Sequence, residues 1–132
     1  SIRAANTFQE KFEAVFSYFE NYMHSPLYEG GCPLMNVAVE ADDSNPILRK
    51  QAMVILKELR QSVTKLIENG IKNGQVLQDV DSAYFTTIII GSLEGGIMMS
   101  RLEQNESAIQ QSVQHLRSIV DSISIEKRSE IV

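Results

Sequence analysis

The sequence predicts a single all-α domain with five helices, three of them long. Apolar residues recur at the three- and four-residue spacing of a helix face in every long segment, and no stretch shows the strict alternation typical of a β-strand. Helix-start and helix-end signals separate these segments within 132 residues, a length typical of one domain.

The first helix begins after Thr7, because Thr7 and Glu10 have the T-x-x-E spacing of a capping box. We expect it to end at Ser25-Pro26, since proline cannot continue a helix. One side of this helix carries a stripe of apolar and aromatic residues. The stripe is either the core-facing side of the helix or the aromatic wall of a pocket, and both can hold at once. Its members are Phe8, Phe12, Val15, Phe16, Phe19, Tyr22 and Met23.

A glycine-rich turn then precedes a short helix that begins at Pro33 and ends near Ala41. One face of this helix holds Cys32, Met35, Asn36 and Val39. Beside apolar residues on the same face, a lone cysteine is expected to be a buried small hydrophobic side chain rather than a reactive group. Asn36 is either a satisfied buried amide or a hydrogen-bonding group for a ligand.

The next helix is long, capped by Asn45, opened by Pro46 and running to about Asn73, with Gly74 as its terminator. Lysine and glutamate alternate on its other side, which indicates a solvated face rather than a track for phosphates. Its apolar stripe is Leu48, Ala52, Ile55, Leu56, Leu59, Val63, Leu66 and Ile67.

The stretch from Asp79 to Glu103, with Asp79 as its cap, is apolar on nearly all sides and so must be buried on nearly all sides. One side holds Tyr84, Ile88, Gly91, Gly95, Met99 and Leu102, and the other Ile89, Leu93, Gly96, Ile97 and Ser100. Only a thin strip is left for water: Ala83, Thr87, Glu94 and Arg101.

Three glycines in this stretch each cost roughly 1 kcal/mol relative to alanine in a helix interior. They are Gly91, Gly95 and Gly96. We infer that a second helix or a ligand approaches the backbone there; the alternative is a merely central core helix. The stretch is too polar to be a membrane span.

The last helix is capped by Asn105 or Ser107. Its apolar residues are spaced 4, 3, 4 and 3, as in helices packed nearly parallel or antiparallel. They are Ile109, Val113, Leu116, Val120 and Ile123. The tail from Glu126 to Val132 is expected to fray.

Composition excludes several function classes. The net charge is −5 and the basic residues are scattered, which argues against a nucleic-acid surface in this chain. The single cysteine excludes an internal disulfide and fits a reducing cytoplasm, and we expect no signal segment. Paired Glu-x-x-His motifs, phosphate loops, paired cysteines and Gly-x-Ser-x-Gly are all missing, so we expect no catalysis, no metal and no cofactor.

Four segments carry a resemblance to a known family. They are Gly31–Glu40, with the pattern Gly-Cys-x-x-x-x-x-Ala-x-Glu; Asn45–Arg49; Gly70–Val76; and Asp81–Arg101, with Gly-Ser-Leu-Glu-Gly-Gly. In this order and spacing they resemble the C-terminal ligand-binding and dimerisation domain of a tetracycline-repressor (TetR) family transcriptional regulator. The likeness covers roughly Phe8 to Ile123.

Such regulators begin with a basic DNA-binding domain that contains a helix-turn-helix, and nothing in residues 1–132 fits one. We therefore expect these residues to form one regulatory domain, with DNA contacted only through an N-terminal domain that is absent from this chain. The resemblance also implies a pocket enclosed by the first helix, the Asn45–Asn73 helix and the Asp79–Glu103 helix.

The expected pocket is mainly apolar, which is the usual composition of a small-molecule site. Aromatic walls, and the lack of Arg or Lys on the inward stripes of the first and third helices, predict a small apolar or aromatic effector rather than a strongly anionic one. Alternatively, these side chains fill one another's space and no cavity exists. The expected ligand-binding residues are Phe12, Phe16, Phe19, Met23, Met35, Asn36, Leu59, Val63, Tyr84 and Ile88.

The resemblance further implies a homodimer in which the last two helices pair with their copies as a four-helix bundle. A second chain would then bury the side of the Asp79–Glu103 helix that its own chain leaves exposed. The expected interface residues are Leu93, Gly96, Ile97, Ser100, Ile109, Val113, Leu116 and Val120.

These expectations combine into one functional prediction. The chain is the effector-sensing and homodimerisation domain of a cytoplasmic transcriptional repressor, which releases DNA on binding a small, mainly apolar molecule. The alternative is a helical adaptor domain that binds another protein through an exposed apolar face. A small enzyme is a third and less favoured alternative.

Overall fold

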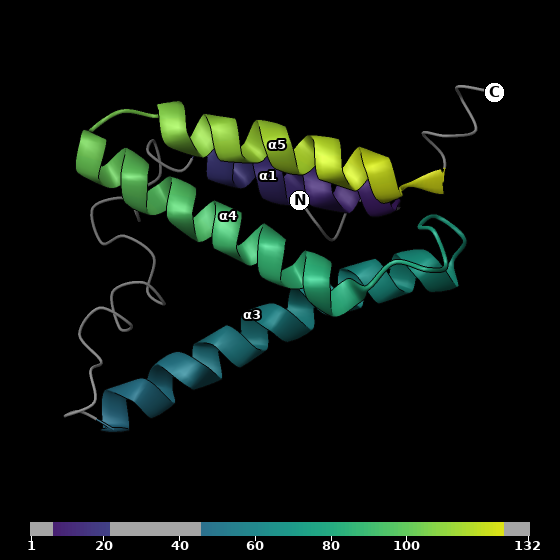
Figure 1. Ribbon diagram of the computed structural model, residues 1–132, viewed down its shortest axis with the longest axis horizontal. Helices are drawn as coiled ribbons and strands as arrows, with labels where there is room; N and C mark the ends of the chain where they lie inside the picture. Colours follow the sequence, from purple (N-terminus) through teal and green to yellow (C-terminus); the bar gives the residue numbers. More distant parts are fainter. Residues whose placement is uncertain (1–6, 22–45, 126–132) are drawn as a thin grey trace.

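The computed structural model describes residues 7–21 and 46–125, and in these ranges it contains four helices and no strand (Figure 1). The helices are α1 (Phe8–Glu20), α3 (Pro46–Lys72), α4 (Ser82–Glu103) and α5 (Ser107–Ile123). The predicted all-α class is confirmed for this part of the chain. None of these four helices is both long and apolar enough to cross a bilayer. The predicted short helix from Pro33 to Ala41 lies outside the described residues.

Local signals set both ends of α1. The Thr7 Oγ1 accepts a hydrogen bond from the backbone N–H of Glu10 at 3.1 Å, as the capping box predicts. The helix ends at Glu20, earlier than the predicted end at Ser25-Pro26. Asn21 leaves the helical conformation there, and its side-chain amide donates to the carbonyl of Ser17 at 2.9 Å.

The end of α3 lies within one residue of the predicted position. Gly74 adopts a φ of 72°, a left-handed conformation that suits glycine at a helix end. The amides of Gln75 and Val76 then both donate to the carbonyl of Gly70, at 2.8 and 3.1 Å. Val76 also forms an isolated antiparallel bridge with Ser124, so the turn after α3 is tied to the end of α5.

The cap of α4 is Asp81 rather than the predicted Asp79. The Asp81 Oδ1 accepts the backbone N–H of Tyr84 at 3.1 Å, and the helix therefore starts at Ser82. Both aspartates precede the same apolar run, and the sequence alone did not show which of them caps the helix.

The start of α5 depends on α4 as well as on its own residues. The N-cap position is taken by Glu106 and not by either predicted cap, Asn105 or Ser107. Asn105 Oδ1 does accept the backbone N–H of Ser107 at 3.0 Å. The N-cap residue itself, Glu106, makes no side-chain cap hydrogen bond. Instead Ser100 Oγ, on α4, accepts the amide of Ile109 at 2.9 Å in a buried contact. The neighbouring helix thus satisfies an amide that a local cap would otherwise have to satisfy.

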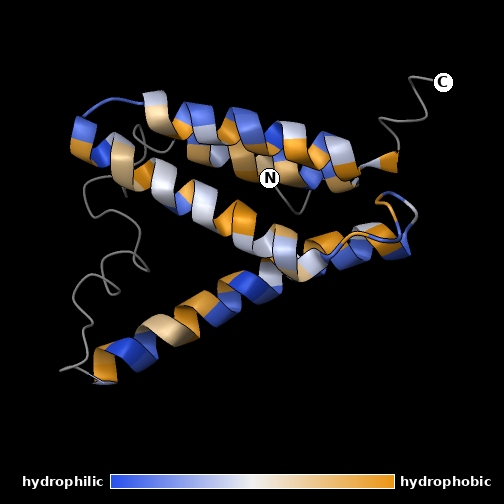
Figure 2. Cartoon of the chain, viewed as in Figure 1, coloured by the Kyte–Doolittle hydropathy of each residue, from blue (hydrophilic) through white to orange (hydrophobic). Residues whose placement is uncertain are grey.

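The helices form a small bundle in which α4 and α5 lie antiparallel and side by side (Figure 1). α1 packs on α5, and α3 packs on both α4 and α1. The N-terminal half of α3 extends away from the other described helices, and hydrophobic and hydrophilic residues alternate along it (Figure 2).

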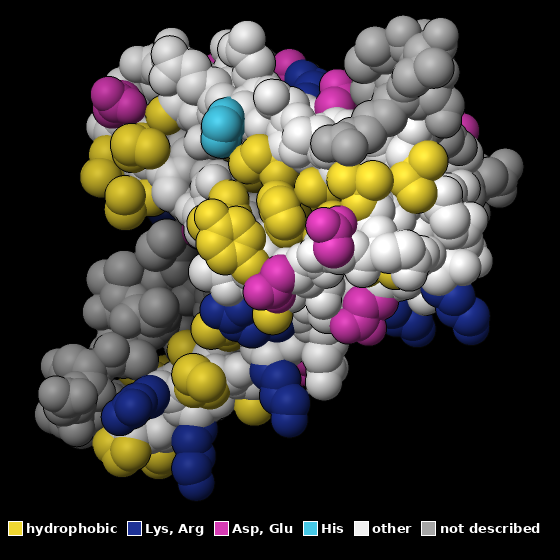
Figure 3. All heavy atoms as spheres, turned by 45° about the vertical axis from the view of Figure 1, so that its right-hand side comes forward, with side chains coloured by type: hydrophobic (Ala, Val, Ile, Leu, Met, Phe, Trp, Pro, Cys, Tyr) yellow, Lys and Arg dark blue, Asp and Glu magenta, His cyan; other side chains and the backbone are white. Residues whose placement is uncertain are grey.

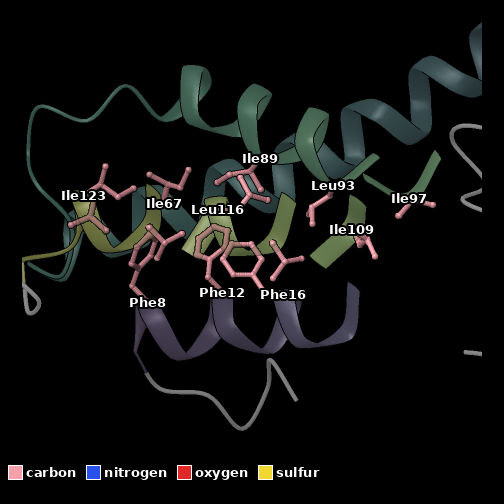
Figure 4. Close-up of a cluster of buried hydrophobic side chains, with 13 residues drawn as sticks. Phe8, Phe12, Phe16, Ile67, Ile89, Leu93, Ile97, Ile109, Leu116 and Ile123 are labelled. Atoms are coloured by element: carbon pink, nitrogen blue, oxygen red, sulfur yellow. The ribbon is translucent and has the colours of Figure 1, made fainter. Parts of the chain in front are cut away.

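The core lies between α1, α4, α5 and the C-terminal half of α3 (Figure 4). Phe8, Phe12 and Phe16 point into it from α1, and each is at most 3% exposed. The rings of Phe8 and Phe12 meet edge to face, with centroids 5.0 Å apart. The core-facing reading of the α1 stripe is therefore confirmed for these three residues.

The eight residues predicted to form a dimer interface lie between α4 and α5 of one chain. All eight predicted interface residues are buried inside one chain, and none of the seven with a stated exposure exceeds 5%. On α4 they are Leu93, Gly96, Ile97 and Ser100, and on α5 they are Ile109, Val113, Leu116 and Val120. They pack one side of α4 on α5 of the same chain, and α5 leaves the other side of α4 uncovered.

That other side of α4 is exposed and largely apolar, and we call it the outer face of α4. Its exposed side chains and their exposed fractions are Tyr84 59%, Met98 43%, Met99 44% and Leu102 78%. A Cβ added at Gly91 or Gly95 would meet no atom within 4 Å. The predicted water-facing strip is only half correct, since Ala83 and Thr87 are exposed whereas Glu94 and Arg101 are half-buried.

Candidate functional site

A cavity of about 180 Å³ lies between α1, α3 and α4. All of its lining residues except Ser62 and Glu94 are hydrophobic. The lining consists of Phe12, Val15 and Phe19 from α1; Leu59, Ser62, Val63 and Leu66 from α3; and Ile89, Ile90, Leu93 and Glu94 from α4. A dry cavity of about 150 Å³ holds a benzene molecule, so this one has room for an aromatic ring with a short chain.

The cavity forms because three helical stripes converge. Phe12 and Phe19 lie two helical turns apart and so share a face of α1. Leu59, Val63 and Leu66 follow the same three- and four-residue spacing on α3. The lining residues of α4 are two adjacent pairs, one turn apart, on the side that faces α3.

Four of the ten predicted ligand-binding residues line this cavity: Phe12, Phe19, Leu59 and Val63. Met23, Met35 and Asn36 lie outside the described residues.

The remaining three lie elsewhere in the molecule. Phe16 is buried in the core and borders the groove between α1 and α5 instead. Tyr84 is exposed on the outer face of α4, and Ile88 is half-buried but does not line the cavity. The lining of the cavity therefore includes predicted residues from α1 and α3 but none from α4, which turns a different side toward them.

The most consequential residue that the sequence prediction missed is Glu94. It was expected in the water-facing strip, but it is half-buried, lines the cavity, and its Oε2 is shielded from solvent. One signal was available: Glu94 is the only charged residue between Asp81 and Arg101. A lone charge within so apolar a run is costly to bury and therefore indicates a specific environment.

Hydroxyl groups beside the cavity hold α3 against α4. The hydroxyls of Thr64 and Thr86 are 2.9 Å apart and share a hydrogen bond, and Thr86 is only 1% exposed. Next to them, Arg60 Nη1 donates to Thr87 Oγ1 at 2.8 Å. These contacts fix two walls of the cavity relative to each other.

A second group of polar contacts joins α1 to α5. Arg117 donates to both carboxylate oxygens of Glu13, from Nη2 at 2.7 Å and from Nε at 3.0 Å, and it also pairs with Glu20. These hydrogen bonds lower the pKa of Glu13 below its usual value and raise the pKa of Arg117. The adjoining groove is larger, about 460 Å³. Its principal charges already pair with one another, so we regard the apolar cavity as the better candidate site.

A family model described as "Tetracyclin repressor-like, C-terminal domain" matches residues 9–116. The crystal structure of a TetR transcriptional regulator from Chloroflexus aurantiacus J-10-FL is similar with a TM-score of 0.83 and 28% sequence identity, over 91% of this chain and 61% of that one.

The crystal structure of a TetR family transcriptional regulator from Cytophaga hutchinsonii is similar with a TM-score of 0.81 and 24% identity, over 94% of this chain and 62% of that one. At this identity the second likeness shows the fold alone. This chain thus spans about three fifths of the length of both solved structures. Comparison with curated proteins gives no match.

Proposed function

The chain belongs to the tetracycline-repressor-like family of transcriptional regulators, as a C-terminal domain, and we propose that it is the effector-sensing and homodimerisation domain of a transcriptional repressor. Membership of the family implies a role in transcription regulation and not in catalysis. We place the DNA-contacting part outside residues 1–132, in the share of the related structures that this chain does not span.

The cavity between α1, α3 and α4 is the observation that carries the sensing role. A ligand inside it touches three helices at once, so its affinity depends on how those helices are arranged. Binding shifts the domain toward the arrangement that it favours, by no more than the difference in affinity between the two arrangements. In the intact repressor, that shift would release the DNA.

Homodimerisation is supported by the outer face of α4. Large apolar side chains such as Leu102 are exposed there, and Gly91 and Gly95 leave room for another helix to come close. The neighbouring outward residues of α5 are polar and exposed: Gln111, His115, Ser118 and Ser122. A second copy placed here would cover apolar surface with apolar surface.

The same face supports the alternative of a helical adaptor, since a helix of another protein would fit it equally well. Figure 3 shows hydrophobic side chains gathered over one face of the molecule, with Lys and Arg side chains mostly below them. The oligomeric state separates the two proposals, because an adaptor requires no second copy.

Thermal unfolding with small apolar and aromatic compounds tests the sensing role. A ligand present at 100 times its dissociation constant should stabilise the chain by about 2.7 kcal/mol. Val63→Phe fills the cavity and should abolish the shift. Val54→Phe, on the exposed part of the same helix, should preserve it. If no compound raises the midpoint, or if Val63→Phe binds as the unchanged chain does, the sensing role is wrong.

A further inference from the structure

We propose that the cavity between α1, α3 and α4 takes a hydrocarbon without any hydrogen-bonding group, whose body is one aromatic ring with a short aliphatic chain. The inference rests on the proposed sensing function and narrows its ligand from mainly apolar molecules to uncharged hydrocarbons. Two properties of the cavity support it, the chemistry of its surface and its size.

The surface of the cavity offers a ligand almost no polar atom. Ser62 and Glu94 are the polar residues of the lining, but polar atoms contribute only a trace of the surface that faces the cavity. The Glu94 Oε2 is shielded from solvent. A hydroxyl, ammonium or carboxylate group that entered with a ligand would therefore give up its hydrogen bonds to water without gaining others, which is unfavourable.

The backbone of the two longer walls does not supply hydrogen bonds either. Residues 59–66 of α3 and 89–94 of α4 lie inside continuous helices, several residues from both ends. The N–H and C=O groups there bond to each other along the helix, since only the first and last turns of a helix leave such groups unpaired. The lining therefore recognises a ligand by its shape and by contact between hydrocarbon surfaces.

The size of the cavity limits the hydrocarbon to one ring. A dry cavity of about 150 Å³ holds a benzene molecule, and this one is about 180 Å³, which leaves room for a short chain. The sites of drug-sized ligands are larger, at roughly 300–1,000 Å³. Affinity should therefore rise roughly fourfold with each carbon atom added to benzene, and the rise should stop once the chain fills the cavity.

Titrations followed by NMR measure the affinity and locate the bound compound. The methyl signals of Val63, Ile90 and Leu93 report on the lining directly, because these residues belong to it. Benzene, toluene and ethylbenzene should shift these signals with increasing affinity. Biphenyl has a second ring and should bind less tightly than ethylbenzene.

Toluene and phenol form the decisive pair, because they differ only in a methyl and a hydroxyl group of similar size. Octanol, a solvent that can hydrogen-bond, penalises a hydroxyl group by at most about thirtyfold, whereas cyclohexane penalises it much more. We expect the cavity to resemble cyclohexane, so toluene should bind at least about thirtyfold more tightly than phenol.

A matched variant tests whether the missing hydrogen-bond partner causes this preference. Val63→Thr keeps the shape of the side chain and places a hydroxyl in the wall of the cavity. It should reduce the preference for toluene by at least about threefold, since the phenol hydroxyl gains a partner. Val54→Thr makes the same change on the same helix at a side chain that is 56% exposed, so it should leave the preference unchanged.

The outcomes separate this inference from the proposed function. If phenol binds as tightly as toluene, if biphenyl binds more tightly than ethylbenzene, or if Val63→Thr keeps the full preference, the hydrocarbon class is overturned while the cavity stands as a ligand site. If no compound shifts the methyl signals of the lining, the sensing function fails and this inference fails with it. Circular dichroism shows whether Val63→Thr folds, and if it does not, the order of the compounds on the unchanged chain still decides.

Discussion

Gly96 lies where α5 comes closest to α4. A Cβ at this position would be 2.7 Å from Ser112 Oγ and 3.1 Å from the Cα of Ile109, so a methyl group there would push the two helices apart. We predict that Gly96→Ala lowers the free energy of unfolding by about 1–3 kcal/mol, as overpacking of a core does. Urea denaturation followed by circular dichroism measures the change.

Gly91 provides the matched control, because it lies on the same helix and a Cβ there meets nothing within 4 Å. In the isolated chain Gly91→Ala should raise the free energy of unfolding by up to about 1 kcal/mol, through helix propensity alone. Equal destabilisation by both substitutions would contradict the close contact at Gly96.

The ion pair of Glu13 with Arg117 predicts a pH dependence. Hydrogen bonding to Arg117 lowers the pKa of Glu13 in the folded chain below its ordinary value of 4.5. Its contribution to stability is therefore present above about pH 4.5 and is lost as the pH falls through the lowered pKa. Because Glu13 is about half exposed, the contribution is at most about 1 kcal/mol.

Glu13→Gln should accordingly lower the free energy of unfolding near neutral pH, and the difference should disappear as the pH falls through the lowered pKa of Glu13. Salt at about 1 M should reduce the difference at neutral pH. Urea denaturation from neutral to acidic pH measures the difference, with the exposed Glu58→Gln as control. A destabilisation by Glu13→Gln that is equally large at low pH would mean that lost packing, not the ion pair, is responsible.

At the scale of the helices, the ends of α4 and α5 depend on each other. Ser100 of α4 accepts the amide of Ile109, which lies in the first turn of α5, and the contact is buried. Ser100→Ala would leave that amide without its acceptor, so we predict a loss of about 1–3 kcal/mol. Ser107→Ala, at the exposed first residue of α5, should change stability by much less.

Hydrogen exchange localises the effect of Ser100→Ala. If the serine caps α5, the amides of the first turn of α5 should lose protection before those of the rest of the helix. Uniform loss of protection over α4 and α5 would instead indicate that the hydroxyl stabilises the bundle as a whole.

At the scale of the whole molecule, the outer face of α4 predicts a homodimer that can be separated without unfolding. Met99→Asp combined with Leu102→Asp changes two exposed residues, so it should give monomers with an unchanged helix content. Leu116→Asp buries a charge in the core and should unfold the chain instead. Sedimentation velocity and circular dichroism distinguish these results.

Ile47→Asp is the control for the dimer test, because Ile47 is 70% exposed but lies on the projecting end of α3. It should leave the oligomeric state unchanged. A monomeric unmodified chain at micromolar concentration would exclude the homodimer and favour the adaptor.

Local sequence patterns were enough to predict the four described helices and the inward side of α1. Thr7 and Gly74 carry side-chain and backbone preferences that act within a few residues, and the structure places them at the helix ends where those preferences put them. Phe8, Phe12 and Phe16 stand on a helix with one apolar side, so burying that side was the single favourable arrangement.

Which side of α4 meets α5 could not be predicted from the sequence and follows from tertiary packing. α4 is apolar around most of its circumference, so burying either side removes a similar apolar area from water, and periodicity cannot choose between them. The choice follows from packing, because Gly96 and Ser100 let α5 approach closely and bond to α4. Once α5 occupies that side, α3 packs on another side of α4, and Glu94 becomes half-buried among the residues that line the cavity.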